Sequence, residues 1–122
     1  MSATSGDDLI TDSKTRDGVL VLRLGKRLTI AAAPELRDAL TEQVKAADGP
    51  RLVVLDLSQT DSLDSGALGV LIQFHRDLDR KEVPLVLAAP NESVRGLVEI
   101  MKLDSIFDIH EDVDAAIEGS AP

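Results

Sequence analysis

The segment Leu63–Leu71, with the sequence LDSGALGVL, combines residue types that could act together chemically. Asp64 and Ser65 stand where a helical hydrophobic pattern begins, and the first N–H groups of a helix lack acceptors within it. A side-chain oxygen of either residue could cap these groups. A phosphate carried by Ser65 would also be favoured there, because the helix dipole places positive charge at this end. Two interpretations stay open: an ordinary helix cap, or a phosphorylation site that adds negative charge beside Asp61 and Asp64.

Two apolar residues of the same expected helix could form a surface for a partner. The core-facing stripe of the helix is centred on Ala67, Leu71, Phe74 and Leu78. Leu68 and Ile72 point roughly 100° or more away from this stripe. Apolar side chains beside a candidate switch serine favour a partner-binding patch. The alternative is that a neighbouring helix or loop covers both residues.

The sequence offers little for catalysis. His75 and His110 are the only histidines, and the chain has no cysteine. No His/Glu pair has metal-ligand spacing, and no Gly-x-Ser-x-Gly elbow occurs. Gly25-Lys26 is followed by Arg27 where a phosphate-binding loop requires Ser or Thr. We therefore expect a protein that is not an enzyme and that uses no metal and no cofactor.

The apolar run Leu52–Leu57 contains Asp56 near its end, and this resembles the phosphoacceptor strand of response-regulator receiver domains. Those domains also need an acidic pair after their first strand and a lysine after a late strand. Here Asp7-Asp8 precedes the first expected strand, and Lys102 ends an expected helix. The spacing therefore argues against the receiver interpretation.

Charge and composition narrow the possible partners. The 122 residues carry a net charge of −9, which repels nucleic-acid phosphates and anionic lipids. Phe74 and Phe107 are the only aromatic residues, so no platform exists for stacking bases. The start of the sequence is polar and acidic, unlike a signal peptide, and no apolar run is long enough to span a bilayer. We expect a cytoplasmic protein that binds neither nucleic acid nor membrane.

The hydrophobic period alternates between that of strands and that of helices. Strands are expected at Leu9–Lys14, Val19–Leu24, Leu52–Leu57, Pro84–Ala89 and Ile106–Ile109, with a tight turn at Asp17-Gly18. Helices are expected from Pro34 to about Ala47, from Ser65 to Asp79, after the capping residue Asn91, and over Asp112–Glu118. The order predicts an α/β fold with one mixed sheet of four to five strands: an opening hairpin, then alternating strands and about four helices. Residues 9–118 would form the domain, and residues 1–8 and 119–122 would be disordered.

The run Val54–Ser58, a short spacer, and then Leu63–Leu71 closely resembles the STAS domain of bacterial anti-sigma-factor antagonists. The resemblance extends over nearly the whole chain. Further similar segments are Gly25 with Leu28, Ala33–Leu36, Met101–Asp104 with Ile106-Phe107, and Asp112–Ile117. The Asp-Ser pair at a helix start after a buried strand is the specific part of the resemblance, and it implies the STAS fold.

The resemblance implies a partner switch. In the family, the unphosphorylated antagonist binds an anti-sigma factor that is also an ATP-dependent serine kinase, and the sigma factor is freed. The kinase then phosphorylates the serine after the Asp, here Ser65, and the antagonist is released until a serine phosphatase resets it. Asp64, Gly66, Leu68, Ile72 and Thr29 would belong to the partner-binding surface. An alternative is a STAS scaffold or regulatory subunit, in a signalling or transporter assembly, whose serine is not cycled.

Two positions depart from the family pattern. Family members often have Ser or Thr where this chain has Gly66, so no second hydroxyl adjoins Ser65. They also commonly have an acid where this chain has Thr29, in the segment thought to lie near the switch serine. Both departures bear on which partner is recognised more than on the fold.

Overall fold

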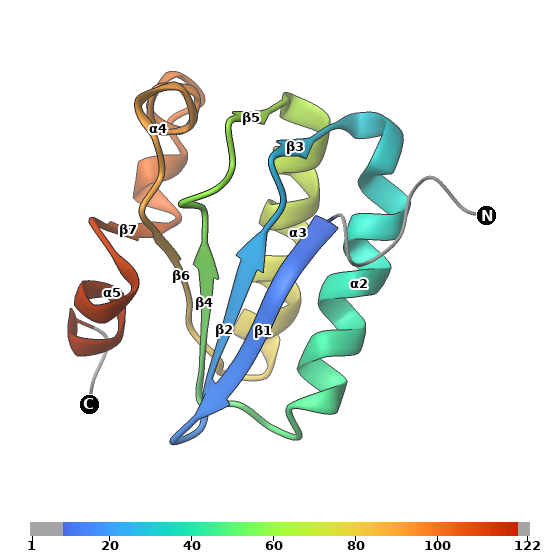
Figure 1. The fold of residues 1–122 in the computed structure, drawn as a ribbon, viewed down its shortest axis with the longest axis vertical. Coiled ribbons are helices and arrows are strands. Elements are labelled where there is room, and N and C mark those ends of the chain that lie inside the picture. The colour runs from blue at the N-terminus through green and yellow to red at the C-terminus, as the bar shows by residue number, and fades with distance from the viewer. Residues whose placement is uncertain (1–8, 120–122) are drawn as a thin grey trace.

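A five-stranded mixed sheet forms the centre of the computed structural model, which describes residues 9–119 (Figure 1). Its strand order is β1-β2-β4-β6-β7. The strands are β1 (Ile10–Arg16), β2 (Val19–Leu24), β4 (Leu52–Asp56), β6 (Leu85–Ala88) and β7 (Asp108–His110). β1 pairs antiparallel with β2, and every later pair is parallel. The predicted mixed sheet, with an opening hairpin followed by alternating strands and helices, is confirmed.

The hairpin turn lies where the sequence predicts it. Asp17 has φ 53° and Gly18 has φ 80°, and the flanking residues Arg16 and Val19 pair with each other. Two central residues with positive φ define the type of turn whose twist matches that of the strands. Gly18 tolerates this conformation without a steric penalty, so the Asp-Gly pair fixes the register of β1 on β2.

Helices cover both faces of the sheet (Figure 1). On one face lie α2 (Ala33–Ala46) and α3 (Ser65–Arg80), while α5 (Val113–Gly119) covers part of the other. Strand β4 shows the division, because Val53 and Leu55 belong to the larger core cluster and Leu52 and Val54 to the smaller one. All four side chains are at most 1% exposed. A strand buried on both faces explains why this run is continuously apolar rather than alternating.

A second, two-stranded parallel sheet was not predicted. It pairs β3 (Arg27–Leu28) with β5 (Ser62–Leu63) beyond the carboxyl ends of β2 and β4. Such short strands leave no hydrophobic period in the sequence. The pair positions the segments around the start of α3, because β5 leads into the first turn of α3 and β3 leads into the 3-10 helix η1 (Ile30–Ala32).

The last part of the domain differs in detail from the prediction. The helix α4 (Glu92–Ile100) is capped by Asn91 as expected, but it is followed by a second 3-10 helix, η2 (Leu103–Ser105). The final strand therefore begins at Asp108, two residues later than predicted. Gly119, which was expected in a disordered tail, is the last residue of α5. The other residues of the two predicted disordered segments, 1–8 and 120–122, lie outside the described residues.

Candidate functional site

Asp64 joins the start of α3 to the segment that follows β3. Its backbone is extended, and its Oδ1 accepts a hydrogen bond from the N–H of Ala67 at 2.9 Å. Its Oδ2 accepts one from the N–H of Ile30, also at 2.9 Å. Asp64 is therefore both the N-cap of α3 and a bridge to η1.

The same hydrogen bonds hold Asp64 in its charged form. The N–H of Ala67 contributes most to lowering the pKa of the Asp64 carboxyl below its ordinary value of 3.8, and the N–H of Ile30 follows. The N–H of Gly66 lowers the pKa further, and partial burial opposes the shift. Donors that favour the carboxylate over the neutral acid produce this direction.

Ser65 is the first residue of α3, and it is exposed to solvent. The sequence allows either Asp64 or Ser65 to cap the helix, and in the structure the cap is Asp64. The hydroxyl of Ser65 is thus not required to hold the helix start. The N–H groups that were expected to be free for a phosphate are partly occupied, because those of Gly66 and Ala67 already face the Asp64 carboxylate.

Backbone hydrogen bonds join the segment just before Ser65 to the segment around β3. The N–H of Asp64 donates to the carbonyl of Leu28 at 3.1 Å, and the N–H of Ser62 donates to the carbonyl of Lys26 at 3.1 Å. Thr29 follows β3, is exposed, and precedes η1. The structure therefore brings Thr29, Asp64, Ser65 and Gly66 to one end of the molecule.

Ile30 also lies at this site, although the sequence pattern does not indicate a role for it. It is 68% exposed, and its side chain lies over Gly66. The available signal was weak: a large aliphatic residue next to Thr29 that fits neither the strand pattern before it nor the helix pattern after it.

Leu68 does not belong to an exposed patch, so this part of the prediction is wrong. Its side chain is completely buried in the larger core cluster, and Ile72 is half-buried against the same cluster. The same core contains Leu36 and Leu40 of α2, a helix that packs alongside α3. A helix with a neighbour on one side buries a wider face than a single stripe.

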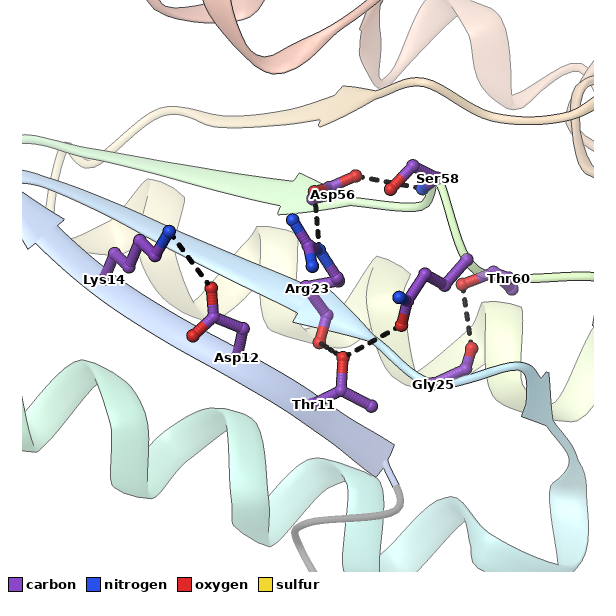
Figure 2. Close-up of polar contacts among 9 residues, drawn as sticks. Thr11, Asp12, Lys14, Arg23, Gly25, Asp56, Ser58 and Thr60 are labelled. Carbon is purple, nitrogen blue, oxygen red and sulfur yellow. Dashed lines mark hydrogen bonds and ion pairs between the residues drawn. The ribbon is translucent and has the colours of Figure 1, made fainter.

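A polar network braces the loop that leads to this site (Figure 2). Nε of Arg23 lies 3.2 Å from Oδ2 of Asp56, while the other carboxylate oxygen accepts from the N–H of Ser58 at 2.9 Å. Farther along the loop, the buried hydroxyl of Thr60 donates to the carbonyl of Gly25 at 2.9 Å. Asp56 is 5% exposed and both of its oxygens are engaged. This side chain therefore serves the fold, which weakens the receiver interpretation further.

Other kinds of site find little support within residues 9–119. No cluster of three or more His, Cys, Asp or Glu residues there could hold a metal ion. None of the helices in this range is both long and apolar enough to cross a membrane. A groove of about 470 Å³ lies between the β1–β2 hairpin and α5, and no residue of β5 or α3 lines it. It is thus separate from Ser65.

Known proteins share this fold and sequence pattern. The family model of the STAS domain matches residues 11–116, and the chain therefore belongs to the STAS domain family. A solved anti-sigma factor antagonist from Mycobacterium paratuberculosis is 29% identical, with a TM-score of 0.80 over 95% of this chain and 97% of that one. The anti-sigma-B factor antagonist of Staphylococcus aureus is 24% identical over 85% of this chain and 94% of its own length. The Bacillus cell fate determinant SpoIIAA shares the fold at 15% identity in its phosphorylated form (TM-score 0.67, 90% of this chain and 98% of that one), and its unphosphorylated form has also been solved.

Proposed function

We propose that this protein is an anti-sigma-factor antagonist that works by partner switching. Its unphosphorylated form binds an anti-sigma factor with ATP-dependent serine kinase activity and so frees a sigma factor. The kinase phosphorylates Ser65, the complex separates, and a serine phosphatase restores the binding form. The protein itself catalyses nothing, needs no cofactor, and acts in the cytoplasm.

The observation that carries this proposal is the position of Ser65. It is an exposed serine on a helix start that Asp64 and the β3–β5 pair hold in place. A kinase can reach such a serine without unfolding the domain. A partner that binds this rigid surface would contact Ser65 directly, so its affinity can depend on whether Ser65 is phosphorylated. The names of the relatives support an anti-sigma factor as that partner.

Charge explains how phosphorylation would release the partner. A phosphate adds about −1.5 to −2 charge units at neutral pH. On Ser65 this charge adjoins the carboxylate of Asp64, whose pKa is already lowered, and Asp61 is exposed nearby in sequence. In a partly dehydrated interface the added anion meets repulsion and loses solvation. The fold should persist, because the core lies below this surface.

Thr29 belongs to the same proposed surface. It is exposed and adjoins Ile30, whose N–H is bonded to Asp64. We infer that Thr29 tunes partner recognition by leaving out a charge that relatives commonly carry there. Gly66 adjoins the phosphoacceptor in the same way. Leu68 is fully buried and supports the surface from below, while the half-buried Ile72 keeps part of its side chain available to the partner.

The test is mass spectrometry of the protein purified from its host, both with its bound partners and after release. The proposal expects an anti-sigma factor kinase in the unphosphorylated fraction and phosphoserine at Ser65 in the released fraction. Stable association with transporter or signalling subunits, with Ser65 unmodified in every fraction, would instead support the scaffold alternative and overturn the proposal.

A further inference from the structure

Ile30 is exposed and yet held from two directions. Its backbone N–H donates to Oδ2 of Asp64 at 2.9 Å, and its side chain rests on the first turn of α3. Single apolar residues on a protein surface are ordinary, so exposure alone means little. What distinguishes Ile30 is that the carboxylate that accepts from its N–H, Asp64, also caps the start of the helix bearing Ser65.

Gly66 is what allows Ile30 to lie there. A Cβ at position 66 would overlap the Cβ of Ile30 and come within 2.8 Å of its Cδ1. Gly69, in the next turn of α3, offers a comparison, because a Cβ there would meet nothing within 4 Å. The absence of a side chain at Gly66 is therefore matched to the position of Ile30, whereas Gly69 carries no such constraint.

We propose that Ile30 is the apolar anchor of the surface that receives the kinase partner, and that Gly66 is the residue that seats it. The proposal rests on the proposed function of Ser65. The partner should present a small apolar pocket beside the site that holds the serine. Around Ile30 the surface is polar, formed by Thr29, Asp64 and Ser65, which is the arrangement of an apolar centre inside a polar rim.

Fixing the side chain in advance favours binding. An aliphatic side chain that already rests in one position loses less conformational freedom when a partner covers it. Covering Ile30 also removes apolar surface from water at a point next to the phosphoacceptor. Ile30 would thus contribute part of the binding free energy that the repulsion from a phosphate on Ser65 has to exceed before the partner is released.

The experiment measures binding to each purified anti-sigma factor kinase encoded in the source genome, with ADP, by isothermal titration calorimetry. Ile30→Ala should weaken binding to the partner by about tenfold or more, the loss typical of a truncated anchor. Gly66→Ala should weaken it in the same direction by displacing Ile30. The matched controls Gly69→Ala and Ile100→Ala, the latter at an 81% exposed position in α4, should change affinity by less than about twofold.

A double variant tests whether Gly66 acts through Ile30. In the Ile30→Ala background, Gly66→Ala should cost little further affinity, because the side chain it displaces is already gone. Circular dichroism and urea unfolding confirm that each variant is folded, and if Gly66→Ala does not fold, Ile30→Ala decides the question alone.

The outcomes separate this inference from the proposed function. If Ile30→Ala binds as tightly as the unmodified protein while Ser65→Asp is released, the anchor is refuted and the proposed function stands. Equal losses for Ile30→Ala and Ile100→Ala would also refute it, since the effect would not be specific to this position. If the unmodified protein binds none of the kinases, both the function and the anchor are overturned.

Discussion

The carboxylate of Asp64 accepts a hydrogen bond from the backbone N–H of Ile30 across 34 positions of sequence. Its second oxygen caps α3 through the N–H of Ala67. One side chain therefore holds both the helix that presents Ser65 and the segment that presents Thr29. The geometry of the proposed partner surface therefore depends on this residue together with the pairing of β3 with β5.

Replacing Asp64 with Asn should lower the stability of the fold. Asn caps a helix about as well as Asp, but its amide nitrogen cannot accept the hydrogen bond from Ile30. Urea unfolding should show a lower midpoint for Asp64→Asn. The control is Asp112→Asn, where one carboxylate oxygen caps Ala115 at 2.7 Å, and this change should leave the midpoint nearly unaltered. Equal effects at both positions would contradict the bridging role.

The contribution of Asp64 should depend on pH. Its pKa in the folded protein is lowered below 3.8, so as the pH falls the unfolded chain takes up a proton first. The stabilisation is therefore complete above the unfolded pKa and is lost as the pH falls through the folded pKa. The difference in unfolding free energy between the unmodified protein and Asp64→Asn should hold steady down to about pH 5 and shrink below that. A difference that stays constant down to about pH 3 would contradict this account.

Leu68→Ala should destabilise the protein as a core substitution does. Its side chain is fully buried, and removing three carbons leaves a cavity that the neighbours fill only in part. We expect a loss of about 2–5 kcal/mol in urea unfolding, similar to that for Leu71→Ala. A change at the exposed position Gln73→Ala serves as the control on the same helix and should lie within about 0.5 kcal/mol. A negligible loss of stability for Leu68→Ala would contradict the burial of this side chain in the core.

The case of Leu68 shows where prediction from the sequence stops. The strand and helix order, the Asp17-Gly18 turn and the Asn91 cap could all be predicted, because each depends on a local pattern or a single residue type. The burial of Leu68 depends instead on elements from elsewhere in the sequence, because its core cluster also contains residues of the sheet and of α2, which packs alongside α3. One stripe of apolar residues cannot show how many neighbours a helix has.

The residues of the candidate site also fall into those that the sequence could predict and those that it could not. Asp64 and Ser65 could be found from the sequence because a helix start has a recognisable chemistry. Ile30 could not, since its place at the site depends on the pairing of β3 with β5 and on a contact with Gly66, both of which join distant segments. Strands as short as Arg27–Leu28 and Ser62–Leu63 form only when the larger sheet brings them together.

Thr29→Asp should alter recognition of the partner without altering the fold. The residue is exposed beside the hydrogen bond between Ile30 and Asp64, so the new charge faces the partner. We expect a change in the affinity for the anti-sigma factor kinase or in the rate of Ser65 phosphorylation, measured by calorimetry and by phosphate incorporation. Thr41→Asp adds the same charge at an exposed position in α2 and should change neither. If the two variants behave alike, position 29 is passive.

Calorimetric titration of Ser65 variants against the anti-sigma factor kinase, with ADP or ATP, tests the central claim most directly. Ser65→Ala should bind the partner constitutively and resist phosphorylation, because the hydroxyl is absent and the fold does not depend on it. Ser65→Asp should bind at least roughly tenfold more weakly, about 1.4 kcal/mol, with an unchanged circular dichroism spectrum. If Ser65→Asp binds as tightly as the unmodified protein, and Ser65→Ala is still phosphorylated, the switch does not lie at Ser65.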